Sequence, residues 1–158
     1  MGVLHYDFKG MLYDEWEENH VYTTAARTIT DADVNAYCAI SGDYNPLYTN
    51  KYFAESSIYG KPVVPGALTF IITNGLDCQT LWVDGSYIGL LDQQQSFKKP
   101  VYVGDTIYLT MTPVAKRLSR KPGRGIITYR MAAYNQNDEL VMDGTWVILM
   151  ATDRDHME

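Results

Sequence analysis

The sequence predicts an α+β domain in which an antiparallel β-sheet wraps around one long, apolar α-helix. Residues 66–81 are mostly apolar and begin directly after a proline, which is typical of a buried helix. Apolar and polar side chains alternate in four later runs, and glycine, proline and asparagine turns separate these runs. This alternation favours antiparallel strands with one face against a core. The four predicted strands are residues 87–97, 105–118, 125–135 and 140–150.

The first half of the chain predicts one strand and one helix before the long helix. Residues 21–29 are rich in threonine and β-branched side chains, which favours a strand. Thr30 is a candidate N-cap for a helix over residues 31–40. Gly42 follows that helix and is a typical helix terminator.

The middle of the chain predicts two further helices joined by a loop over residues 59–65. Residues 50–56 predict a short helix with Tyr52 and Phe53 turned inward. The long helix carries apolar side chains at helical spacing, which predicts a buried stripe. The members of this stripe are Leu68, Ile71, Ile72, Gly75 and Leu76.

Length and composition predict a single domain over residues 1–158, with residues 1–20 as an acidic lead-in segment. Two interpretations of the lead-in stay open: it packs Tyr13 and Trp16 on the body, or it is a frayed terminus. The two cysteines, Cys38 and Cys78, lie in apolar helical patterns, and we expect buried thiols.

The net charge of −6 argues against a nucleic-acid partner, which would need a broad basic surface. No apolar run approaches the roughly 20 residues that a membrane-spanning helix needs. The N-terminal residues lack the pattern of a secretory signal, so we expect a cytoplasmic protein. The three histidines are scattered near the two ends, and we expect no metal site.

Residues 41–46, Ser-Gly-Asp-Tyr-Asn-Pro, form a polar turn that contains the first candidate catalytic group. The Asp43 carboxylate can orient a water or accept a proton, although it can also serve only to close its own turn. Asn45 can hold the turn through hydrogen bonds from its side chain to the backbone. At Gly66 the long helix begins with free amides, which suit a polarised carbonyl; a plain loop-to-helix junction is the alternative.

The turn and its continuation through Leu47, followed by Pro65-Gly66 at a helix start, resemble the MaoC-like hydratases and dehydratases. The resemblance covers about residues 21–150 and implies a hot-dog fold, an acyl thioester substrate and a homodimer. It also implies that Asp43 is catalytic, that Asn45 supports the geometry of the site and that the Gly66 amide binds the thioester oxygen.

The sequence departs from the family at Tyr48, where the family pattern places a catalytic histidine. Tyrosine is a poor base at neutral pH because its ordinary pKa is about 10. Three interpretations stay open: a hydratase in which Tyr48 supplies or orients a proton, a thioesterase or another acyl-thioester enzyme, and a non-catalytic acyl-CoA-binding protein. None of the three needs a cofactor beyond the coenzyme A of the substrate.

Two groups of residues are candidates for binding the substrate. Tyr44, Tyr59 and Pro65 flank the catalytic candidates and can line an acyl pocket. Residues 116–124 hold five of the chain's 13 cationic side chains, and they suit the phosphates of coenzyme A or an acidic acyl carrier protein. A solvated hairpin tip is the alternative, and Lys98-Lys99 is a weaker version of the same feature. The proposed cationic contacts are Arg117, Arg120, Lys121 and Arg124.

Overall fold

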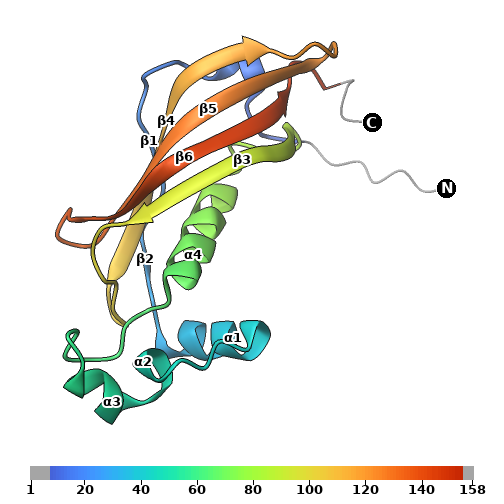
Figure 1. The fold of residues 1–158 in the computed structure, drawn as a ribbon. Helices are drawn as coiled ribbons and strands as arrows, with labels where there is room; N and C mark the ends of the chain where they lie inside the picture. Colours follow the sequence, from blue (N-terminus) through green and yellow to red (C-terminus); the bar gives the residue numbers. More distant parts are fainter. Residues whose placement is uncertain (1–7, 155–158) are drawn as a thin grey trace.

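A six-stranded antiparallel sheet curves around the central helix α4 (Figure 1). The computed structural model describes residues 8–154. The strands follow the order β1-β4-β5-β6-β3, and β2 also pairs with β4. The helices are α1 (Asp31–Ser41), α2 (Pro46–Thr49), α3 (Lys51–Ser56) and α4 (Gly66–Gln79), preceded by a 3₁₀ turn, η1 (Tyr13–Glu15). The strands are β1 (Tyr22–Thr23), β2 (Arg27–Thr28), β3 (Tyr87–Phe97), β4 (Thr106–Leu118), β5 (Arg124–Tyr134) and β6 (Leu140–Ala151).

The α+β class and the four long strands of the second half are confirmed. The predicted single strand over residues 21–29 is wrong, because the chain forms two short strands that both pair with β4. Between the two short strands, the Thr24 side chain bonds directly to β4: its Oγ1 accepts a hydrogen bond from Leu109 N at 3.0 Å. A side chain thus replaces the backbone acceptor there and interrupts the strand.

The core lies between α4 and the concave face of the sheet, where Leu68, Ile72 and Leu76 are all at most 5% exposed. The predicted stripe is wrong at Ile71, which is 54% exposed. Thr69, Thr73 and Asp77 occupy the adjacent buried positions. Since side chains four residues apart lie on one face of a helix, these three form a buried polar row along α4. The sheet contributes mainly Ile107, Leu109, Met111, Ile127, Tyr129, Met131, Trp146, Ile148 and Met150.

Helices α1, α2 and α3 lie together beyond one end of the sheet (Figure 1). As predicted, Thr30 caps α1 by accepting from Asp33 N, and Gly42 ends it in the left-handed conformation with φ 75°. The short helix α3 forms as predicted, but the inward placement of its aromatic rings is wrong. Tyr52 is 83% exposed and Phe53 47% exposed, because Ala54 is the residue that this six-residue helix buries.

The lead-in segment packs on the body where the structure describes it; residues 1–7 lie outside the described part. Trp16 is 1% exposed and contacts the rings of Tyr22, Trp82 and Tyr129 edge-on. The prediction of two buried thiols is half wrong: Cys38 is buried, whereas Cys78 is exposed near the end of α4. Within residues 8–154 no helix is long and apolar enough to span a membrane.

Candidate functional site

The polar turn is fixed at both of its ends by local hydrogen bonds. On the α1 side, Asp43 N donates to Ser41 Oγ at 3.1 Å, directly after the left-handed Gly42. On the other side, the Asn45 side chain caps α2 by accepting from Leu47 N at 3.0 Å, and Pro46 occupies the first turn of that helix. The turn therefore holds Asp43 between two helix ends, and Asn45 has the structural role that its sequence position predicts.

Asp43 lies in a cluster of tyrosines. Its half-buried carboxylate accepts a hydrogen bond from the Tyr37 hydroxyl on α1 at 3.3 Å, so a neighbouring helix helps to orient it. Burial raises the pKa of Tyr48, and the negative charge of nearby Asp43 raises it further. The Tyr48 hydroxyl therefore keeps its proton at neutral pH. It is suited to donate a hydrogen bond, and it is not suited to act as a base.

A cavity of about 390 Å³ opens where α4 begins. Tyr48, Tyr59 and Gly66 line it, together with Phe97 at the end of β3. Gly66 sits against Phe97 so closely that an added Cβ would lie 3.0 Å from the ring. The close approach of helix and ring explains why glycine suits the first position of α4.

The first backbone amides of α4 point toward the N-terminal end of the helix, and this cavity lies at that end. Pro65 precedes the helix and has no side chain that can cap it. The first turn closes only when Thr69 N donates to Pro65 O at 3.0 Å. The amides before Thr69, including that of Gly66, thus have no partner within the helix, and the dipole of α4 favours negative charge beside them.

The structure brings some of the predicted site residues together and leaves others apart. Tyr48, Tyr59 and Gly66 share the cavity, and Pro65 directly precedes Gly66. Asp43 is near enough to Tyr48 to raise its pKa. Tyr44 belongs to the same turn, but its side chain is 62% exposed.

The cationic residues of segment 116–124 lie elsewhere. This segment is the tip of the β4–β5 hairpin, at the end of the sheet opposite to α2 and α3 (Figure 1). Strand β4 alone, from Thr106 to Leu118, separates the two ends by about 40 Å. Lys98 and Lys99 do line the cavity, where they form ion pairs with Asp143 and Glu139 at 3.0 and 2.6 Å.

Sequence reasoning missed two features. The first is Tyr37, whose contact with Asp43 depends on how α1 meets the turn; its position six residues earlier gives only a weak signal. The second is a cavity of about 460 Å³ farther along α4, whose lining residues come from distant parts of the chain. In residues 8–154, no three His, Cys, Asp or Glu side chains are grouped closely enough to hold a metal ion.

Comparison with known proteins identifies similar chains. The model of the family described as "MaoC like domain" matches residues 15–135. An (R)-specific enoyl-CoA hydratase of Aeromonas caviae is 36% identical over 118 residues, which are 74% of this chain and 83% of the relative.

Two solved structures are similar in fold. The (R)-hydratase of A. caviae involved in PHA biosynthesis superposes with a TM-score of 0.70 at 30% identity, covering 84% of this chain and 95% of that one. A conserved hypothetical protein of Mycobacterium tuberculosis with a double hotdog fold has a TM-score of 0.82 at 22% identity, covering 92% of this chain and 46% of that one. The hot-dog fold expected from the sequence is thereby confirmed.

Proposed function

This chain belongs to the MaoC-like domain family, and we propose that it catalyses the reversible addition of water to a 2-enoyl thioester of coenzyme A or of an acyl carrier protein. One observation carries the proposal: the start of α4 at Gly66, whose first amides have no partner within the helix, shares a cavity with Tyr48, which is itself close to Asp43. A carbonyl-binding amide and an acid–base group are the two elements that this reaction needs.

In the proposed reaction, the Gly66 amide donates a hydrogen bond to the thioester oxygen. Addition at C3 places negative charge on that oxygen in an enolate-like state, and the amide stabilises it. In other enzymes one such donor contributes roughly 10²–10³ in rate.

Asp43 accepts a proton from water while the water oxygen bonds to C3, and the same proton then passes to C2. Water is thus added across the double bond, and the carboxylate is restored. Since the raised pKa of Tyr48 makes it a weak acid, its role is to orient the water through its hydroxyl. The histidine that the family has at this position is then replaced by a positioning group.

For the carrier part of the substrate, Lys98 and Lys99 are better placed than the β4–β5 hairpin, because they line the cavity. We further propose a homodimer. In it, the cationic hairpin of one copy binds the coenzyme A phosphates or the acidic carrier protein of a substrate held in the cavity of the second copy. The contacts would be Arg117, Arg120, Lys121 and Arg124. A cytoplasmic location stays a prediction from the sequence.

A panel of enoyl-, 3-hydroxyacyl- and saturated acyl-CoA tests the proposal. Loss of the enoyl absorbance with the thiol still masked is the expected result. Release of free thiol would instead identify a thioesterase. Thermal stabilisation by acyl-CoA without either signal would identify a binding protein, for which the poor basicity of Tyr48 is the supporting observation.

A further inference from the structure

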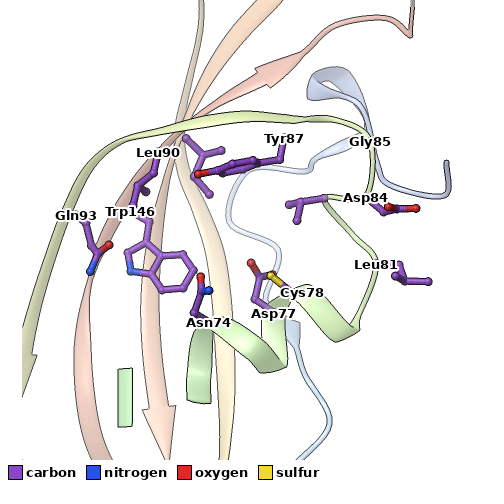
Figure 2. Close-up of a pocket in the computed structure, with 12 residues that line it drawn as sticks. Asn74, Asp77, Cys78, Leu81, Asp84, Gly85, Tyr87, Leu90, Gln93 and Trp146 are labelled. Atoms are coloured by element: carbon purple, nitrogen blue, oxygen red, sulfur yellow. The ribbon is translucent and has the colours of Figure 1, made fainter. Parts of the chain in front are cut away.

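The second cavity lies between the C-terminal half of α4 and strand β3, and its volume is about 460 Å³. Figure 2 shows Asn74 and Asp77 on α4 facing the space below Tyr87, with Trp146 and Gln93 to one side. Leucine, isoleucine and tryptophan side chains form much of the remaining wall. The cavity thus combines an apolar lining with a few polar groups, as small-molecule sites do.

Asp77 is the unusual member of this lining. It is only 4% exposed, and its Oδ1 has no hydrogen-bond partner among the described residues. Burial alone raises the pKa of its carboxyl to about 7. The Tyr129 hydroxyl, whose pKa is raised by burial and by the nearby charge of Asp77, is likewise buried without a hydrogen-bond partner among the described residues. A buried carboxyl oxygen without a hydrogen-bond partner destabilises a fold, so this oxygen of Asp77 indicates a place where a ligand can supply the missing donor.

The polar row on α4 runs from this cavity to the one at Gly66. Thr69 lines the first cavity and Asp77 the second, with fully buried Thr73 between them. The hydroxyls of Thr69 and Thr73 donate to carbonyls of the helix itself, those of Pro65 and Phe70. Above its pKa of about 7 the Asp77 carboxyl is ionised and only accepts hydrogen bonds, so in that form it cannot use those carbonyls. Asp77 is therefore the one member of the row that needs an outside donor.

The spacing of the two cavities fits one extended ligand. Asp77 lies eleven positions after Gly66, which is about 16 Å along a helix. Both cavities also border β3: Phe97 lines the first, and Leu90 and Gln93 line the second. An acyl chain held at its thioester by Gly66 and directed along the seam between α4 and β3 would bring its far end to Asp77.

We propose that the second cavity receives the far end of the acyl group, and that Asp77 selects chains that carry a hydrogen-bond donor there, a hydroxyl or an amine. This inference rests on the proposed function for the placement of the thioester. A donor would satisfy the Asp77 carboxylate. A plain alkyl end would leave that carboxylate unpaired, and a carboxylate end would be repelled. Asn74, Gln93 and Tyr87 offer further polar contacts to the same end.

The test is calorimetric titration with saturated acyl-CoA thioesters of increasing length that end in a methyl, hydroxyl, amino or carboxyl group. Saturated chains need no turnover, so the result does not depend on whether the protein is a hydratase. For chains long enough to span the two cavities, we expect the hydroxyl and amino ends to bind at least tenfold more tightly than the methyl end. The carboxyl end should bind most weakly.

Three variants locate the effect. Asp77→Leu, which has nearly the same shape, should reverse the preference in favour of the methyl end. Asp77→Asn should keep the preference for the hydroxyl and lose that for the amine, because it retains polarity without charge. Asp84→Asn is the matched control: this carboxylate borders the same cavity but already accepts from Lys9 N at 3.1 Å, so the preference should persist.

Equal dissociation constants for all four ends in the wild-type protein would overturn the inference, as would a preference that survives Asp77→Leu. If enoyl-CoA turnover is then found without any end-group preference, only the inference fails. If the end-group preference is found without turnover, only the proposed reaction fails.

Discussion

The two cavities along α4 differ in how their polar groups are satisfied. At the N-terminal cavity, local structure supplies the partners: Tyr37 donates to Asp43, and Asn45 caps α2. At the C-terminal cavity, Asp77 Oδ1 has no partner among residues 8–154. The first arrangement orients the Asp43 carboxylate and the polar turn for chemistry through local hydrogen bonds. The second costs stability, and it makes sense as a means of selecting a ligand.

The largest expected effect is on catalysis at the first cavity. Asp43→Asn should lower kcat by about 10²–10⁴, because the amide cannot accept a proton from water. Binding of acyl-CoA should change little, since the amide keeps the size of the carboxyl. Stopped assays of enoyl-CoA hydration together with calorimetry measure both quantities.

Asp31→Asn on the exposed first turn of α1 is the control for this substitution and should retain full rate. An Asp43→Asn protein with wild-type kcat would mean that Asp43 only shapes the turn. The first cavity would then no longer differ from the second by having a catalytic carboxylate beside it.

The second effect is on stability at the other cavity. The folded state raises the pKa of Asp77 from 3.8 to about 7, so ionising it opposes folding. The contribution of this group to stability is therefore most favourable below pH 3.8. It declines as the pH rises through about 7, by about 4 kcal/mol in total at 1.36 kcal/mol per pH unit.

Asp77→Leu removes this penalty and should stabilise the ligand-free protein, by about 3 kcal/mol more at pH 8 than at pH 5. Urea denaturation at the two pH values measures the difference, with Asp84→Asn as the control that lacks the pH-dependent gain. Destabilisation by Asp77→Leu at pH 8 would show that the carboxyl has a structural partner, for which Tyr129 is a candidate because the charge of Asp77 raises its pKa.

The smallest effect concerns Tyr48. Tyr48→Phe should lower kcat about tenfold if the hydroxyl orients water, while Tyr48→His should raise hydratase activity by restoring a base with a pKa near neutrality. The exposed Tyr52 provides the control, because Tyr52→Phe should leave the rate unchanged. Unchanged or lower activity of Tyr48→His would indicate that the cavity has been adapted to another reaction.

Much of the fold followed from local patterns. The alternation in the last four runs predicted β3 to β6 within one residue at each end, and Thr30 and Gly42 marked the bounds of α1. The same local reasoning failed at Thr24, where a side chain replaced the backbone as the hydrogen-bond acceptor. It also failed at Tyr52 and Phe53, because the sequence of a short helix does not show which of its faces is buried. Such outcomes depend on tertiary neighbours that the local sequence does not contain.

The residues of the candidate site also fall into those that the sequence indicated and those that it did not. The polar turn and the start of α4 are short segments whose chemistry is visible in the sequence, and the structure brings Tyr48 and Gly66 to one cavity. Asp77 gave no such signal, because a single acid in an apolar helix is unremarkable until its surroundings are known. The distance of the cationic hairpin from the cavity likewise follows from the length of β4, which separates segments that composition alone had grouped.

The position of β6 has a consequence for how the polypeptide is made. This strand lies between β5 and β3, although β3 precedes it in the chain by more than 40 residues. During synthesis β3 emerges from the ribosome long before β6, the strand with which it pairs among residues 8–154. The cavity between α4 and β3 lacks the Trp146 and Ile148 side chains of β6 until then. The pairing of β3 therefore waits until translation is nearly finished, and its unpaired edge is prone to aggregation during that time.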